Sequence, residues 1–147
     1  MGVSSDMNST MQAGLIISKT LFDLGEKAGA AGIEAIQMVA EITLLNSNLS
    51  QVRTTIIQGQ SRRYAIGATV IIQKILERCQ KVYDELEMSS KRMTAGIRLM
   101  EDLAMRVRCE FERSEVKILK ATLQASSITL HLMQHTLGVS RRETIRR

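Results

Sequence analysis

The chain of 147 residues contains no proline and no tryptophan. Proline removes a helix hydrogen bond and clashes with the preceding turn, so its absence leaves long helices uninterrupted. Aromatic residues make up only 3% of the chain, so aliphatic side chains and methionine must build the core, which suits helix-on-helix packing. A β-sandwich or barrel usually has more aromatic residues and more turn signals. These absences predict an all-α protein.

Cysteine is also scarce, with only Cys79 and Cys109 present. Two cysteines do not make a disulfide framework in a chain of this length, and we expect free, unreactive thiols. The first residues lack the basic segment and the apolar run of a secretory signal. We therefore expect a cytoplasmic protein, with export by a route that needs no cleaved signal left open.

The sequence has few groups that carry chemistry. His131 and His135 are four residues apart and share one helix face within reach of a common metal ion. Residue 132 is Leu, however, where the zinc-protease motif has Glu, and no carboxylate or cysteine lies nearby to complete the ligand set. The glycines at Gly25 and Gly29 follow no strand and precede no Lys-Ser/Thr pair, so they do not form a phosphate-binding loop. The sequence predicts no catalytic residue, no metal site and no cofactor.

Composition along the chain predicts one helical domain over 11–137, between a flexible polar N-terminus over 1–10 and a basic tail over 138–147. A small-residue hinge at 25–32 and a polar break at Ser89–Arg92 are expected to interrupt the helices. Gly25 and Gly138 stand where helix C-terminal glycines are expected. The expected helices run to about Leu24, over Ile33–Ile57, from about Ser61 to Met88, and from Met93 to Leu137.

An apolar seam at heptad-like spacing runs from Ile75 to about Leu132. Such spacing is typical of helices that pack along a shared line of contact. We therefore expect a helical bundle of three to five helices with a long coiled-coil-like C-terminal helix or hairpin. After the polar break the seam consists of Met93, Ile97, Met100, Ala104, Val107, Phe111, Ser114, Ile118, Ala121, Ala125, Ile128 and Leu132.

These features favour a function in binding. We predict a non-enzymatic protein–protein interaction or assembly protein that self-associates, or docks on a partner helix, by burying the seam. The net charge of +5 comes largely from the tail, whose arginines are candidates for a second contact. The residues expected to bind a partner are Met93, Ile97, Met100, Val107, Phe111 and Ile118 in the seam, and Arg141, Arg142, Arg146 and Arg147 in the tail.

Two alternatives stay open at this stage. The first is nucleic-acid binding through the basic tail and the arginine-rich last helix, because phosphate neutralisation needs only such charge; acidic residues interleaved along that helix weigh against it. The second is a membrane-interacting or exported helical protein that uses Ala28–Leu45. Glu34 and Glu41 oppose insertion of that segment, because a carboxylate in the bilayer centre costs a few kcal/mol.

Overall fold

The computed structural model describes the backbone of residues 2–58, 62–96 and 100–146, and the side chains of 2–58, 66–96 and 102–136. Over these residues the chain is helical without strands, which confirms the all-α prediction. The elements in chain order are α1 (Val3–Ala28), the 3-10 turn η1 (Gly29–Gly32), α2 (Ile33–Ile57), α3 (Arg62–Thr94), α4 (Met100–Glu112) and α5 (Ser114–Arg146).

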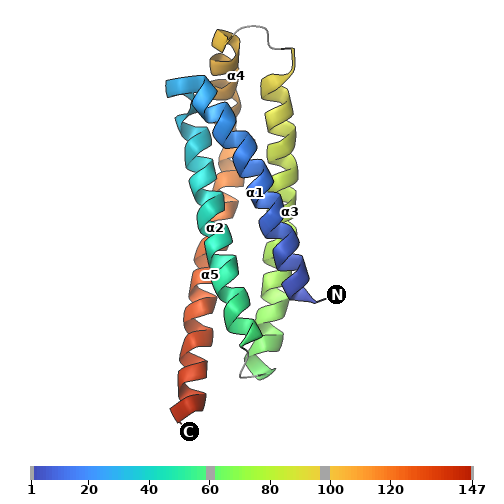
Figure 1. The fold of residues 1–147 in the computed structure, drawn as a ribbon, viewed down its shortest axis with the longest axis vertical. Helices are drawn as coiled ribbons and strands as arrows, with labels where there is room; N and C mark the ends of the chain where they lie inside the picture. Colours follow the sequence, from blue (N-terminus) through green and yellow to red (C-terminus); the bar gives the residue numbers. More distant parts are fainter. Residues whose placement is uncertain (1, 59–61, 97–99, 147) are drawn as a thin grey trace.

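α1, α2 and α3 lie side by side along the long axis of the molecule, and α4 and α5 follow one another along the same direction beside them (Figure 1). α1 packs on α2 and α3, and α5 packs on the same two helices. α1 and α3 run in one direction, α2 and α5 in the other, so each adjacent pair α1–α3 and α2–α5 is parallel. Hydrogen bonds from Lys120 to Gln37 (3.2 Å) and from Gln124 to Glu41 (3.0 Å) fix the alignment of α5 along α2.

The first two helices meet at a corner made of glycines. α1 continues past Gly25 and ends at Ala28, so the C-terminal glycine is Gly29, whose φ of 62° is a left-handed conformation that favours glycine. Gly32 lies directly against the backbone of Gly25. The expected small-residue hinge therefore closes the corner by backbone contact, which no residue with a side chain would permit.

The polar N-terminus is part of α1. The helix begins at Val3, although we expected a flexible segment over 1–10, because Met7 is fully buried and Thr10 is also inside the core. Helix ends are usually frayed when nothing holds them. Here the apolar Met7 holds the first turns in place.

The polar stretch at Ser89–Arg92 does not interrupt a helix, and this expectation was wrong. α3 runs through it to Thr94, and Ser89 and Ser90 are buried. The Ser90 hydroxyl donates to the Glu87 carbonyl (2.7 Å), so the helix satisfies it. The chain leaves the helix at Ala95, followed by Gly96 with a φ of 68°.

The apolar seam passes from the buried side of the helices to the exposed side at Arg113, the one residue between α4 and α5. There the Arg113 amide bonds to the carbonyl of Glu110, three residues back, in place of the usual four. Before this point the seam residues Val107 and Phe111 are buried in the chain's own core; beyond it the seam residue Ile118 is 63% exposed. α5 instead turns Val116, Leu123 and Leu130 to the core.

α5 also continues beyond Gly138, where we expected the last helix to end, and reaches Arg146. A single helical glycine costs only about 1 kcal/mol relative to alanine, so it does not by itself stop a helix. The core that these helices enclose is aliphatic, as the composition predicts; its aromatic residues among the described side chains are Tyr83 and Phe111.

Candidate interaction face and buried polar groups

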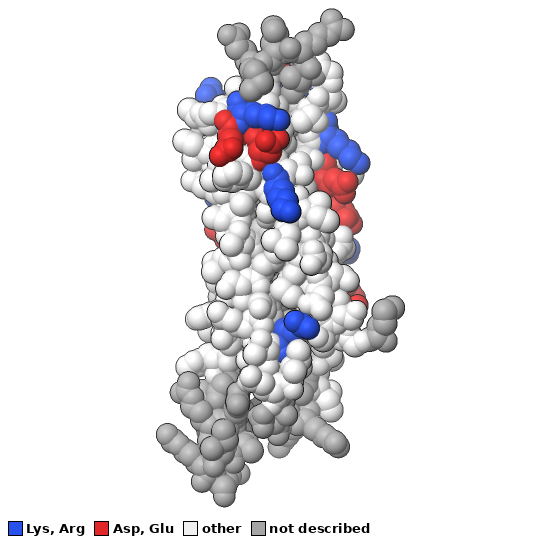
Figure 2. Space-filling model, viewed as in Figure 1, with Lys and Arg blue, Asp and Glu red and all other residues white. Residues whose placement is uncertain are grey.

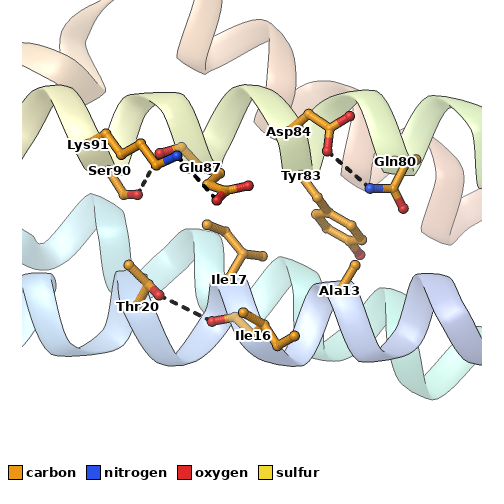
Figure 3. Close-up of a pocket in the computed structure, with 10 residues that line it drawn as sticks. All are labelled: Ala13, Ile16, Ile17, Thr20, Gln80, Tyr83, Asp84, Glu87, Ser90 and Lys91. Atoms are coloured by element: carbon orange, nitrogen blue, oxygen red, sulfur yellow. Dashed lines mark hydrogen bonds and ion pairs between the residues drawn. The ribbon is translucent and has the colours of Figure 1, made fainter.

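A cleft of 490 Å³ opens between the parallel helices α1 and α3 (Figure 3). Ile17 and Ala13 of α1 line one side, and Tyr83 of α3 reaches across toward Ala13. The charged groups on the α3 side are paired along that helix. Gln80 donates to Asp84 (3.1 Å), and Lys91 pairs with Glu87 (3.5 Å). Such i,i+4 pairs are ordinary features of a helix surface, so the cleft carries no set of convergent reactive groups.

Behind this cleft lies a buried layer of small and polar residues. Gly14 leaves room for the Tyr83 hydroxyl and the Asn46 amide, both of which would lie within 3.1 Å of a Cβ at that position. Asn46 donates to the Met11 carbonyl (3.2 Å), while its carbonyl oxygen and the Tyr83 hydroxyl have no hydrogen-bond partner among the described residues.

The thiol of Cys79 belongs to the same layer and is held unreactive. Burial is the main cause that raises the pKa of Cys79 to about 12, and a hydrogen bond with Ser126 opposes it only in part. Burial also raises the pKa of the Tyr83 hydroxyl, and the neighbouring Cys79 adds to the effect. Both groups stay protonated at neutral pH, whereas a nucleophile must ionise. Cys109, the second cysteine, is free and exposed.

Glu110 is the one buried carboxylate among the described side chains, and it links α4 to α3 and to the break residue Arg113. Arg92 of α3 donates to it from Nε (3.2 Å) and Nη2 (2.9 Å), and Arg113 donates from Nη1 (3.0 Å). Arg92 also donates to the buried Ser89. This network explains why a run of polar residues sits inside α3. It fastens the end of α3 to the break between α4 and α5.

Burial by itself would raise the pKa of Glu110, but hydrogen bonds from Arg92 and Ser89 and the charges of Arg92 and Arg113 lower it below 4.5. The folded state therefore binds its proton less readily than the unfolded state. This part of the stability is complete above the ordinary pKa and is lost as the pH falls through the lowered value.

We expect Glu110→Gln to lower the free energy of unfolding at neutral pH by about 1–2 kcal/mol, because both arginines are partly solvated and lose a charged acceptor. Urea unfolding between pH 7 and 3, an acidic window chosen to span the ordinary carboxyl pKa, checks this. The difference between wild type and variant should shrink toward the acidic end. Glu112→Gln, at an exposed position of the same helix, is the control; an equal loss there would refute the assignment.

The solvent side of α5 carries a row of exposed apolar residues. We call Ile118, Ala121, Ala125, Ile128 and Leu132 the outer stripe. All five are exposed, the three large residues by 61–63%, and they recur at intervals of three and four along one face. The stripe lies opposite the core residues of the same helix, so α5 is apolar on two sides.

The outer stripe lacks the charges that normally cover a surface helix. No Asp, Glu, Lys or Arg occurs from Ala121 to Ser140. α3 is equally long, 33 residues, yet its exposed positions carry charges at Lys74, Glu77 and Arg78. From Ala121 to Thr136 the solvent side of α5 is therefore uncharged when the histidines are neutral, with polar Gln124, His131 and His135 beside the outer stripe.

Three threonines at intervals of seven flank the outer stripe, and their hydroxyl groups are hydrogen-bonded within the helix. The hydroxyls of Thr122, Thr129 and Thr136 each donate to the carbonyl four residues back, at 2.9, 3.0 and 3.1 Å. Those carbonyls belong to Ile118, Ala125 and Leu132, which are stripe residues. Because these polar groups are satisfied within the helix, covering them costs little free energy.

The predicted partner-binding residues are thus divided. Met93, Val107 and Phe111 are buried in the chain's own core, so they hold the fold together and present no surface to a partner. Ile118 is exposed and belongs to the outer stripe. The other predicted residues lie outside the described side chains: Ile97, Met100, Arg141, Arg142, Arg146 and Arg147.

Charge is also sparse on the side of the molecule that α1 covers. Figure 2 shows charged side chains gathered toward its upper part and an uncharged middle. α1 has no charge between Asp6 and Lys19, and α2 none between Glu41 and Arg53. Val3–Ile57 contains an 18-residue window with a mean hydropathy of 1.3, enough for a membrane span by length and composition alone. The structure bends this segment into the α1–α2 hairpin.

His131 and His135 are exposed on α5, and the described residues contain no group of three His, Cys, Asp or Glu side chains that could hold a metal ion. Comparisons with protein-family models, with curated proteins and with solved structures found no match to this chain. Its function is therefore argued from the surfaces described above.

Proposed function

We propose that this protein is a non-enzymatic interaction protein, a helical bundle that assembles with another helical protein, its own copies included, by burying the outer stripe of α5. The observation that supports this function is the stripe itself. A surface helix of a monomer usually turns charged residues to water, and contiguous exposed apolar patches mark interaction sites. Heptad spacing is the pattern by which one helix packs along another.

Binding is favoured over catalysis by the state of the buried titratable groups. Cys79 and Tyr83 are held protonated, and Glu110 is engaged by two arginines. A catalytic acid, base or nucleophile needs a pKa near the working pH and access to a substrate. These three groups have structural roles, and the cleft between α1 and α3 adds no nucleophile with a base beside it.

The adjoining side of α2 widens the proposed contact. Leu44 and Ile33 are exposed by 52% and 57% on the helix that lies along α5. Lys120 and Gln124 bond to α2 between these apolar positions. These polar side chains already form hydrogen bonds with each other. A partner that covers this surface would therefore not have to supply hydrogen bonds for them.

We expect wild-type protein to associate as its concentration rises, and Ile128→Asp to weaken the association by about 100-fold, or roughly 2.7 kcal/mol, because a carboxylate would be buried without a partner. Sedimentation velocity across a wide concentration range checks this. Ile16→Asp is the matched control, since Ile16 is 67% exposed on α1, which does not neighbour α5 within the described residues.

Circular dichroism should show the same helicity in both variants, because both positions are exposed. A wild type that stays a single chain at every concentration would contradict assembly. Equal weakening by Ile16→Asp and Ile128→Asp would contradict the choice of surface.

A further inference from the structure

Four of the five outer-stripe residues form a two-fold pattern in the sequence; the fifth, Leu132, has the polar Ser114 as its counterpart. Ile118, Ala121, Ala125 and Ile128 follow one another at intervals of three, four and three, so the order reads the same in both directions. The centre of this pattern is Leu123, whose own side chain is fully buried on the opposite side of α5. A surface with this symmetry is complementary to itself when one copy is turned end over end.

We propose that a second copy of this chain covers the outer stripe, with its α5 antiparallel to the first and a two-fold axis level with Leu123. This inference rests on the proposed function and specifies its partner and geometry. Ile118 then lies opposite Ile128 of the partner subunit, and Ala121 opposite the partner's Ala125. The small residues at the centre let the two helix backbones approach closely, and the large residues fill the space on either side.

Charge favours this direction over a parallel one. A parallel pair would place Lys117 and Lys120 beside their own copies and bring the four tail arginines together at one end. Like charges held side by side oppose association. In the antiparallel pair, Lys117 lies level with the partner's uncharged Thr129, and the two tails point to opposite ends.

The neighbouring helix fits the same axis. The bonds from Lys120 to Gln37 and from Gln124 to Glu41 place Ala40 of α2 level with Leu123. Ala40 is exposed and small, so α2 also has its narrowest point at the axis, with apolar Leu44 and Ile33 on either side. The pattern of a small centre and large flanks therefore extends over both helices.

The size of the face is adequate for a stable pair. Residues 114–136 of α5 span about 34 Å at 1.5 Å per residue, and two adjacent helices are about 20 Å wide. The face is thus on the order of 700 Å² per copy, close to the roughly 800 Å² that each partner contributes to a standard protein interface.

Distances between identical labels on the two copies test the proposal. Nitroxide labels are placed at Thr129→Cys or Thr136→Cys, both exposed, in a chain whose exposed Cys109 is replaced by serine. Cys79 is buried and its thiol stays protonated. The two positions lie six and 13 residues from the axis, so identical labels should be separated along the helices by about 18 Å and 39 Å.

Pulsed electron resonance on the full chain measures both separations. Separations that grow from Thr129 to Thr136 by about 20 Å support the antiparallel pair, provided that Ile128→Asp abolishes them and Ile16→Asp does not. Short, equal separations at the two sites would mean a parallel pair. They would overturn the antiparallel arrangement and leave the proposed function standing.

A pair unaffected by Ile128→Asp would overturn both the antiparallel arrangement and the proposed function, as would a wild type that never pairs. Flotation of an unpaired wild type with anionic phospholipid vesicles, lost in Ile128→Asp, would assign the face to lipid and also overturn the inference.

Discussion

Gly32→Ala is expected to destabilise the protein by about 3 kcal/mol or more, at the upper end of overpacking effects. A Cβ at this position would overlap the carbonyl oxygen of Gly25 and lie 2.6 Å from its carbonyl carbon and Cα. These are backbone atoms in the last turn of α1, so they cannot rotate away as a side chain would. The corner between α1 and α2 would have to open, and the core contacts of both helices would be lost with it.

Urea unfolding of two other glycine variants, compared with Gly32→Ala, tests this expectation. Gly25→Ala should cost less, since its Cβ would meet Ile36 Cδ1 at 2.7 Å, the mobile end of a side chain. Gly67→Ala, on α3 with nothing within 4 Å, should stabilise the protein by up to about 1 kcal/mol through helix propensity. If Gly32→Ala behaved like Gly67→Ala, the close contact at the corner would be disproved.

The second large effect is expected from Leu123→Ala, which should lower the free energy of unfolding by about 2–5 kcal/mol. Leu123 is fully buried, and its removal would leave a cavity between α5 and its neighbours. Ile128→Ala, five residues further along the same helix, should change the free energy by no more than about 0.5 kcal/mol at concentrations where the protein is a single chain. Ile128 is 61% exposed there.

This pair of substitutions tests the change of face at Arg113. If the apolar seam continued inward without interruption, Ile128 would be in the core and Leu123 outside, and the two losses would be reversed. Thermal or urea unfolding of the two variants under identical conditions distinguishes the two arrangements. Similar losses for both would mean that neither side of α5 faces water.

The all-α fold follows from composition, but the inward face of α5 does not. Ile118, Ile128 and Leu132 match a heptad as well as the residues that are buried, because this helix is apolar on two sides. Periodicity identifies a stripe and cannot say which of two stripes lies inside. The single-residue break at Arg113 decides this, and neither a glycine nor a proline marks it.

The polar stretch at Ser89–Arg92 illustrates a second limit. Local sequence indicates a helix end there, since serines compete with the backbone for hydrogen bonds. The decisive partner is Glu110, 18 residues further along the chain from Arg92. Interactions at such separations are invisible in a local pattern. Glycine was an uneven guide: the positive-φ residues that mark turns are Gly29, inside the expected hinge, and Gly96, whereas Gly25 and Gly138, where we expected helices to end, lie within α1 and α5.

The parallel packing of α2 and α5 has a consequence for biosynthesis. The hydrogen bonds that join them connect residues 79 to 83 positions apart in the sequence. The hairpin of α1 and α2 therefore emerges from the ribosome well before α5, the helix that covers one flank of α2. During that interval the apolar flank of α2 has no partner within its own chain, and exposed apolar surface in incomplete chains promotes aggregation. Nascent chains that stop before α5 should thus depend most on chaperones.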